Sequence, residues 1–309
     1  MGRNDREDSD PMKPIDSAEL KPRNYKDTKC APALKFEDGA CMPVDLMVHL
    51  AKAYNAECEA GGISGSPIKL LDDLDTLNPK KYKRYLVKKF TERLNSVCDN
   101  QRCWIKQNFT KKLTPQIKKY LRKRVWRPTG PEGQFEWLNT LHIENVMKQH
   151  EDMDTAFHFY GAVPMDFDSL NLEASRLDPK KEVAKGRTKL GVIFNLDEHW
   201  QSGSHWVASF ADLKKGEVYY FDSYGERPEA RVRKYMRRLA KYYKDTTGKK
   251  ARVDYNKVQH QFGGTECGVY SINFIERMLN GDSFDQIVKD KTDDETINEM
   301  RNKYFIGQY

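Results

Sequence analysis

The order of strand-like and helix-like segments after residue 134 constrains the fold more than any other feature of the chain. Strands are expected in four segments rich in β-branched and aromatic residues: Thr188–Leu196, His205–Leu213, Glu217–Ser223 and Ala251–Val258. Apolar residues at helical spacing instead predict helices over residues 135–150, over 229–244 and from Cys267 onward. A chain that runs helix, strands, helix, strand, helix is expected to build an α+β domain.

The part before residue 129 has a different pattern, which predicts a mainly helical N-terminal domain over residues 33–128. Apolar residues at helical spacing occur at Pro43–Asn55, 71–77, 79–98 and 114–126. The segment Arg127–Gly133 is rich in proline and glycine and is expected to be a linker, so a second domain covers residues 134–309. Residues 1–32 are polar and interrupted by proline, which predicts a disordered or extended arm.

Charge is distributed unevenly along the chain. The whole chain has a formal net charge of +7, yet Lys80–Pro128 holds 17 lysines and arginines against two acidic residues, so the remainder is net negative. This asymmetry predicts a polyanionic partner, with nucleic acid as the first choice and a simple solvated helix face as the alternative. The expected nucleic-acid contacts are Lys118, Lys119, Arg122, Lys123 and Arg124.

Membrane and export signals are not evident in the sequence. There is no run of about 18 apolar residues, and the first residues lack the layout of a signal peptide. The sequence therefore predicts an intracellular protein without a membrane partner, whose six cysteines are reduced. Cys98 and Cys103 lie close together, but no second pair accompanies them, so packing cysteines are favoured over a zinc site and no metal is expected.

Cys267 stands where a glycine-rich segment runs into an amphipathic helix, in the stretch QHQFGGTECGVYSINFIERML. The start of a helix carries partial positive charge and free amide N–H groups, which favour a thiolate and can stabilise an oxyanion. Gly263, Gly264 and Gly268 are expected to leave room for a substrate backbone. Cys267 is therefore the candidate nucleophile.

A thiolate nucleophile needs a histidine, and the histidine needs a group that orients it. Two histidines, His199 and His205, each precede a tryptophan. If the hairpin that follows His205 turns at Leu213–Lys214, His205 faces Asp222 directly, with Cα atoms about 5 Å apart. His199 would lie about 20 Å further along the chain. His205 is thus the predicted base, and Asp222 is predicted to fix its tautomer.

The order His205-Trp206, Asp222, Gln261 and Cys267 resembles the ubiquitin-like-protein (SUMO) proteases and adenovirus proteinase. Asp222 lies 17 positions after His205, and Gln261 lies six positions before Cys267. The resemblance implies a papain-like cysteine protease core of permuted order, in which helices flank a mixed sheet. It also implies that the Gln261 amide helps to form the oxyanion hole.

Two further segments are similar to the same family. The stretch QFGGTECGVY parallels the pattern Gln-x-Asn-Gly-x-Asp-Cys-Gly, with Gly263 in place of Asn and Glu266 in place of Asp. Gln259 is a rival for the oxyanion role, but its eight-residue spacing to the cysteine fits the pattern less well. The stretch WLNTLHIENVM, which begins at Trp137, looks like the family's Trp-Leu-Asn-Asp segment, with Thr140 in place of the Asp.

The resemblance also implies which residues contact the substrate. Trp137 and Trp206 would roof a narrow tunnel for a Gly-Gly segment, and Gly264 and Glu266 would be further substrate contacts. The stretch FYGAVPMDFD (Phe159–Asp168) is similar to a segment in the maturation proteases of nucleocytoplasmic large DNA viruses.

The predicted function is that of a viral cysteine endopeptidase, which cuts structural precursors after Gly-Gly during virion maturation. Its expected locations are the virion and the cytoplasmic viral factory of the host. The alternatives are a SUMO or ubiquitin-like deconjugase, an acetyltransferase with a related His, acid and Cys set, and a non-catalytic nucleic-acid-binding protein. No cofactor is expected to be required. DNA is expected at most as an activator, because adenovirus proteinase uses DNA as a cofactor.

Overall fold

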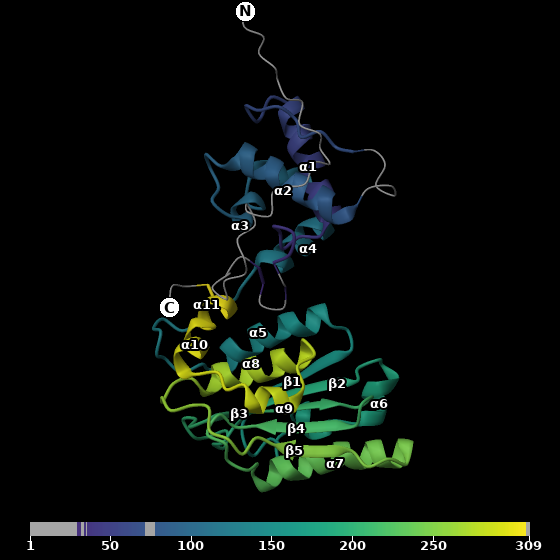
Figure 1. Cartoon of the computed structure of the whole chain (residues 1–309), viewed down its shortest axis with the longest axis vertical. Coiled ribbons are helices and arrows are strands. Elements are labelled where there is room, and N and C mark those ends of the chain that lie inside the picture. The colour runs from purple at the N-terminus through teal and green to yellow at the C-terminus, as the bar shows by residue number, and fades with distance from the viewer. Residues whose placement is uncertain (1–29, 32–33, 35, 72–77, 307–309) are drawn as a thin grey trace, which may run out of the picture. The chain divides into compact units, whose positions relative to one another are not determined.

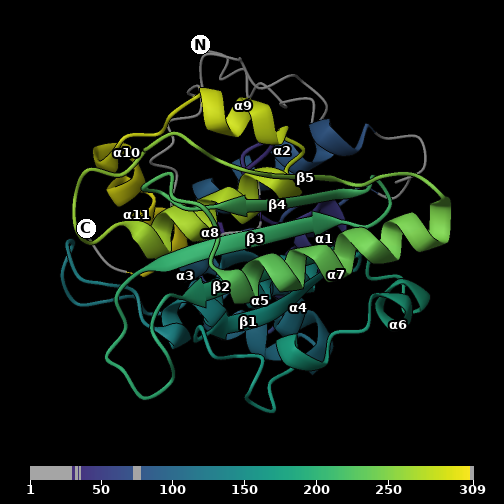
Figure 2. The ribbon, with the colours of Figure 1, turned by 90° about the horizontal axis from the view of Figure 1, so that it is seen from below.

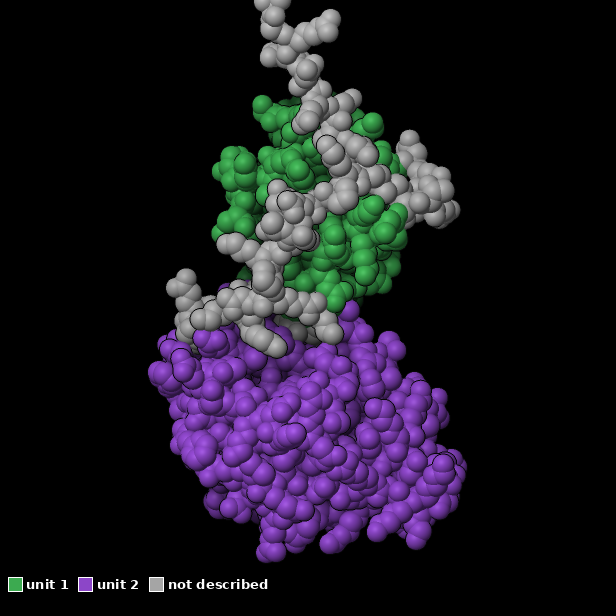
Figure 3. Space-filling view, in the orientation of Figure 1, with its two compact units in different colours: residues 1–126 green, residues 127–309 purple. Residues whose placement is uncertain are grey.

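The computed structural model describes residues 30–31, 34, 36–71 and 78–306, and the chain divides into two compact units, Met1–Trp126 and Arg127–Tyr309 (Figure 1, Figure 3). The arm expected over residues 1–32 lies almost wholly outside the described residues, and so does the helix expected at 71–77. The segment Arg127–Gly133, expected as a linker, stands at the beginning of the second unit.

The first unit is helical, as the periodicity predicts. Its elements are α1 (Val44–Glu59), α2 (Pro79–Leu94), α3 (Gln101–Trp104), the 3₁₀ turn η2 (Asn108–Lys112) and α4 (Pro115–Val125). Asn78 caps α2, because its side chain accepts hydrogen bonds from the amides of Lys80 and Lys81. Tyr82 and Phe90 lie beneath the lysines of α2 and are buried in the core of this unit, so they serve packing.

Four of the six cysteines are paired, which corrects the expectation that all six are reduced. Disulfides join Cys30 to Cys41 and Cys98 to Cys103, with Cα separations of 5.3 Å and 5.4 Å, within the range that a disulfide requires. The backbone folds back after α2 and brings Cys103 beside Cys98, which spacing alone does not reveal. Cys58 and Cys267 are free. Within the described ranges, no three potential ligands gather to hold a metal ion.

The second unit is built on a mixed sheet with the strand order β1-β2-β3-β4-β5. The strands are β1 (Phe157–Val163), β2 (Lys189–Asn195), β3 (Trp206–Asp212), β4 (Glu217–Phe221) and β5 (Arg252–Tyr255). The three central strands pair antiparallel, whereas β1 with β2 and β4 with β5 are parallel. The predicted α+β class, with helices flanking a mixed sheet, is therefore confirmed.

Helices cover both faces of this sheet (Figure 2). α5 (Thr140–Met153) and α8 (Cys267–Leu279) pack on the face to which Ala208 and Phe210 of β3 point, whereas α7 (Ala230–Thr247) packs against Val207 on the other face. The remaining elements are η3 (Ala174–Arg176), α6 (Pro179–Ala184), α9 (Phe284–Lys289), α10 (Asp294–Glu299) and α11 (Arg301–Tyr304). None of the helices in the described part of the chain is long and apolar enough to cross a membrane.

β1 is absent from the strands that the sequence predicts. Gly161 interrupts its apolar run, and a glycine inside a strand weakens the strand signal. The pairing of β1 with β2 shifts register between Phe159 and Ala162, where Gly161 has a φ of 104°, a conformation that favours glycine. β1 is thus an irregular edge strand.

Candidate active site

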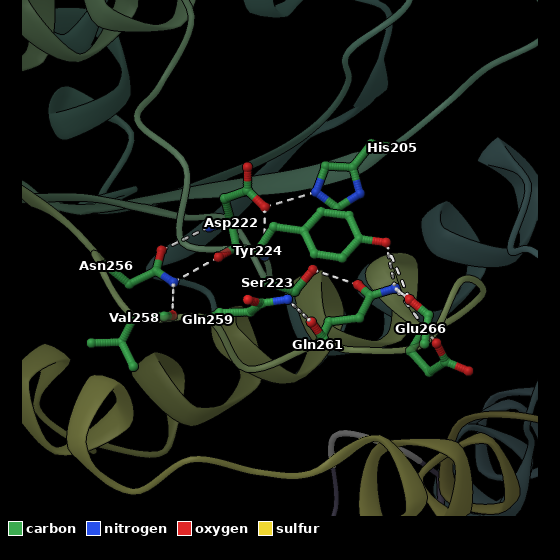
Figure 4. Close-up of polar contacts among 10 residues, drawn as sticks. His205, Asp222, Ser223, Tyr224, Asn256, Val258, Gln259, Gln261 and Glu266 are labelled. Carbon is green, nitrogen blue, oxygen red and sulfur yellow. Dashed lines mark hydrogen bonds and ion pairs between the residues drawn. The ribbon is translucent and has the colours of Figure 1, made fainter.

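Three separate segments bring Cys267, His205 and Asp222 together. His205 immediately precedes β3, Asp222 immediately follows the neighbouring β4, and Cys267 is the first residue of α8, which packs on β3. Nε2 of the His205 ring lies 2.7 Å from Oδ1 of Asp222 (Figure 4). The Cys267 side chain lies close enough to the His205 ring to help raise its pKa. All three residues are buried, so bulk water does not screen these contacts.

The surroundings of His205 raise its pKa to about 9. Burial by itself lowers this pKa, but the hydrogen bond to the Asp222 carboxylate and the proximity of the Asp222 and Cys267 side chains outweigh burial. At neutral pH the imidazole is therefore held as a cation beside the sulfur. An imidazolium in this position stabilises a thiolate, which is the reactive form of a cysteine.

The hairpin register differs by two residues from the predicted one. Ala208 pairs with Phe221, so Asp222 lies diagonally across from His205 and not directly opposite. Asp222 still reaches the same side of the hairpin, because a shift of two residues preserves the alternation of side chains. Tyr224 instead falls opposite His205 in the continued register, and its ring stacks on the imidazole with 4.7 Å between the centroids.

The turn after β4 connects the histidine to the loop that precedes α8. The Ser223 hydroxyl donates to Oε1 of Gln261 at 2.6 Å, and the Tyr224 hydroxyl donates to the Gly263 carbonyl at 3.1 Å (Figure 4). Ser223 also accepts, at its carbonyl, the amide N–H of Gln261 at 2.9 Å. Successive residues of one short turn therefore position both the imidazole and the Gln261 side chain.

Asp222 is held from the loop after β5. The buried Asn256 side chain accepts the Asp222 amide N–H at 2.8 Å and donates to the Asp222 carbonyl at 2.6 Å. Gly225, with a φ of 80°, completes the turn, and a Cβ there would lie 2.9 Å from the backbone of Val258. The sequence analysis misses Asn256, which directly follows β5, and Ser223, which stands two positions after β4. The only signal that could have found them is a polar residue near the end of a strand.

Gln261 is fully buried and its amide has a defined orientation. Because Oε1 accepts the Ser223 hydroxyl, Nε2 points the other way, donates to the Gly263 carbonyl at 3.0 Å and lies 3.4 Å from the Tyr224 hydroxyl. Its rival Gln259 is exposed and donates its own side-chain amide to the Gln261 carbonyl at 2.8 Å. Gln259 therefore helps to hold the loop, while the Gln261 amide lies inside it.

The first turn of α8 has no side-chain cap, so the amide N–H of Cys267 is not occupied by one. A Cβ on the adjacent Gly268 would lie 3.0 Å from Cβ of Leu138. The glycine therefore lets the start of α8 approach the segment before α5. Gly268 serves packing here, which differs from the expected role of leaving room for substrate.

Gly263, Gly264 and Glu266 face the site in different ways. A Cβ on Gly263 would lie 2.6 Å from the Glu266 carboxylate, whereas a Cβ on Gly264 would meet nothing within 4 Å. Glu266 is buried, and although burial acts to raise its pKa, hydrogen bonds from Thr265 and Asn298 lower it. Of these three positions, Gly264 is the one with open space for a substrate backbone. The role of Glu266 as a substrate contact stays a prediction, since donors of the chain itself bind its oxygens.

Trp137 and Trp206, the two expected tunnel residues, line one cleft of ≈ 580 Å³. Trp206 is buried and donates from Nε1 to the Leu138 carbonyl at 2.8 Å, while Trp137 is 47% exposed. Leu138 also packs against α8 at Gly268, next to the candidate nucleophile. Leu138 and Trp206, which directly follows His205, therefore connect one end of the cleft to the candidate site, although Cys267 itself does not line the cleft. The other end extends along β1 and the loop between β2 and β3.

His199 belongs to a different pair. Its Nδ1 lies 2.5 Å from Oδ2 of the buried Asp166, and its own side chain is 53% exposed. The structure thus assigns each histidine its own carboxylate, and it is His205 that contacts Cys267.

Comparison with known proteins identifies the family. The model of the Ulp1 protease family, C-terminal catalytic domain, matches residues 180–309. A thiol protease of Acanthamoeba polyphaga mimivirus is 37% identical over 274 residues, which cover 88% of this chain and 91% of that protein. The chain belongs to the Ulp1 protease family.

More distant relatives agree with this assignment. A cysteine protease of African swine fever virus is 24% identical over 266 residues, 79% of this chain and 97% of that protein. A crystal structure of an African swine fever virus protease has the same fold, with a TM-score of 0.53 at 23% identity over 71% of this chain and 90% of that one. The chain is thus a viral cysteine protease of the Ulp1 family.

The first unit of this Ulp1-family protease carries the basic residues predicted to bind nucleic acid, but these do not all share one surface. Lys118, Lys119, Arg122 and Lys123 line a hollow together with Trp126. Arg124 is instead half-buried, and burial lowers its pKa. A second cleft, of ≈ 450 Å³, is also lined by Lys118 and Arg122, and it adds three cations that the sequence analysis does not single out, Arg102, Lys106 and Lys111.

Proposed function

We propose that this protease is an endopeptidase that cleaves viral structural precursors after Gly-Gly, with Cys267 as the nucleophile, His205 as the general base and acid, and Asp222 as the residue that orients His205. The observation that carries the proposal is the buried His205 ring between Asp222 and Cys267, with its pKa raised to about 9. The cleavages would serve virion maturation, in the virion and in the cytoplasmic viral factory.

In the proposed reaction the Cys267 thiolate attacks the carbonyl carbon of the second glycine and forms a tetrahedral intermediate. The His205 imidazolium gives its proton to the leaving amine as the carbon–nitrogen bond breaks, which leaves a thioester on Cys267. Neutral His205 then takes a proton from a water molecule that attacks the thioester, and the acid product departs. Asp222 stabilises the imidazolium each time it forms.

The oxyanion of both intermediates would be stabilised by two donors, the backbone N–H of Cys267 and Nε2 of Gln261. The amide N–H of Cys267 stands at the uncapped start of α8, where the helix dipole also favours negative charge. Ser223 binds Oε1 of Gln261 and so sets the direction in which the amide faces. Nε2 would exchange its hydrogen bond to the Gly263 carbonyl for one to the oxyanion when the charge develops.

Gly-Gly specificity is supported by the end of the cleft that lies next to the candidate site. Trp206 is tied to the Leu138 carbonyl and packs in the core, and Trp137 lies on the same cleft. Residues without side chains are the ones that pass most easily between two indole rings. Side chains on the last two residues before the cut would collide with these rings.

Peptide cleavage tests this proposal. Wild type should cut Gly-Gly-Ala peptides and leave Ala-Ala-Ala peptides intact. Cys267→Ala and His205→Ala should show no detectable turnover of the Gly-Gly-Ala peptide. His199→Ala, the matched control, should keep most of the wild-type turnover. Turnover that persists in Cys267→Ala would refute the mechanism. Better processing of a folded SUMO precursor than of the Gly-Gly-Ala peptide would instead favour the deconjugase alternative.

We also propose that the first unit binds nucleic acid. The cleft lined by Lys106, Lys111 and Arg122 has five cations and no acidic residue in its lining, and Trp126 is 44% exposed at its side. Phosphates would pair with the cations, and a base could stack on the indole ring.

DNA retention at micromolar protein, measured at several salt concentrations, tests this second proposal. The log–log slope should be about −0.9 per phosphate neutralised on duplex DNA. Changing Lys106, Lys111 and Arg122 to glutamine should flatten this slope, whereas Lys241→Gln on α7 should not. Peptide cleavage measured with and without DNA shows whether DNA is an activator. No retention at low salt would remove nucleic acid as a partner.

A further inference from the structure

The cleft that begins at Trp206 has an acidic lining beyond the tryptophans. Its only basic side chain is His199, which is already paired with the buried Asp166. No lysine or arginine is among the residues that line it. Its four carboxylates are Glu144 of α5, Glu173 before η3, and Asp197 and Glu198 of the loop between β2 and β3.

Two of these carboxylates are matched by a cation of the protein. Glu198 forms an ion pair with Arg231 at 3.1 Å. Glu173 lies 2.8 Å from the buried His158 ring, whose pKa is raised, against the effect of burial, by hydrogen bonds to Glu151 and Glu173. These two side chains therefore contribute less net negative charge to the cleft than their number suggests.

Glu144 and Asp197 form no ion pair with any residue that the structure describes. Glu144 stands beside the edge strand β1, where its Oε1 would lie 3.5 Å from a Cβ built on Gly161. Asp197 accepts hydrogen bonds from the Gly203 amide and the Ser204 hydroxyl, which fix its carboxylate without neutralising it. The cleft thus holds two negative charges that a ligand could match.

We propose that this cleft binds the residues directly before Gly-Gly, and that Glu144 and Asp197 select lysine or arginine there. The inference rests on the proposed function, because the cleft meets the candidate active site at Trp206 and Leu138. A chain that leaves the tryptophans in extended form advances about 3.3 Å per residue and so enters the acidic part within a few residues. Specificity would come from attraction of cations and from repulsion of acidic side chains.

Three peptides of equal length test the inference, with Lys-Lys, Ala-Ala or Glu-Glu placed before Gly-Gly-Ala. We expect kcat/KM to fall in that order, with about a tenfold difference between Lys-Lys and Glu-Glu. High salt should narrow the difference, since exposed charges are screened. Glu144→Gln should reduce it, and Glu144→Lys should reverse the order. The matched control Asp245→Asn, an exposed carboxylate on α7, should leave the ratio as in wild type.

Peptide affinity for Cys267→Ala separates this inference from the proposed function. No cleavage of any peptide by wild type would refute the proposed function, and dissociation constants of the same three peptides would still decide the inference. Tighter binding of Lys-Lys than of Glu-Glu supports it. Equal affinities, or a preference for lysine that survives Glu144→Lys in both assays, would overturn it.

Discussion

Replacing Asp222 by asparagine tests the electrostatics of this site most directly. Asp222 lies 2.7 Å from the His205 ring and is one of two groups that raise the pKa of His205 from 6.5 to about 9. This difference corresponds to about 3 kcal/mol of preference for the imidazolium. Asparagine keeps the size and a hydrogen-bonding oxygen but removes the charge. Without this charge, the pKa-lowering effect of burial is offset less, so the pKa of His205 should fall.

The expected result is a change in the pH dependence of peptide cleavage. If catalysis needs the imidazolium, kcat/KM of wild type should fall as the pH rises through about 9. In Asp222→Asn this alkaline limb should move down by roughly one to three pH units. Because Asp222 and Cys267 raise this pKa together, loss of the Asp222 charge should cost at most about 3 kcal/mol, or up to roughly a hundredfold in kcat/KM at neutral pH. The loss should be smaller than in His205→Ala.

The same substitution should change stability in a pH-dependent way. Because the folded-state pKa of His205 lies above the unfolded-state value, its contribution is fully present below about pH 6.5 and is lost as the pH rises through about 9. Asp222→Asn should therefore lower the free energy of unfolding by up to about 3 kcal/mol in mild acid, and by less above about pH 9. Denaturant titrations measure this difference. An unchanged alkaline limb in the variant would refute the reasoning about His205.

Two further substitutions test other parts of the site. Gln261→Ala should lower kcat roughly a hundredfold with little change in KM, as expected for loss of one oxyanion donor. Gln259→Ala, the matched control, should lower kcat much less. A change confined to KM would instead assign Gln261 to substrate binding. Gly268→Ala should lower the free energy of unfolding by roughly 1–3 kcal/mol, because the new methyl group meets Leu138 at 3.0 Å. Gly264→Ala, with open space, should cost less in the same denaturant titration, and equal costs would contradict the packing argument.

Local sequence pattern determined the elements that carry the candidate site. The strand pattern predicted β3 and β4, and helical spacing predicted α8 with Cys267 at its start. The hairpin argument chose His205 over His199 despite a register error of two residues. This error did not change the predicted partner of His205. Side chains alternate with a period of two along a strand, so after a shift of two residues Asp222 still points to the same face of the hairpin as His205.

The partners that hold the site in place were decided by tertiary structure. Asn256 follows a strand that is parallel to β4, and a parallel pair forms only after the chain has crossed over through α7. Ser223 orients Gln261 from 38 positions away. The role of Gly268 was also decided by tertiary structure. The sequence predicts that this glycine leaves room for substrate, yet Leu138 of a distant segment fills that space.

The acidic cleft and the disulfides were likewise beyond the sequence. Glu144 and Asp197 are far apart in the chain. They line one cleft only because α5, the irregular strand β1 and the β2–β3 loop pack together in the folded unit. Cys30 meets Cys41 for a similar reason. Periodicity and capping act over one or two turns of chain, so a single sequence predicts the elements and the order of the reactive residues. Contacts between distant segments depend on how whole elements pack, and that is decided by the folded core.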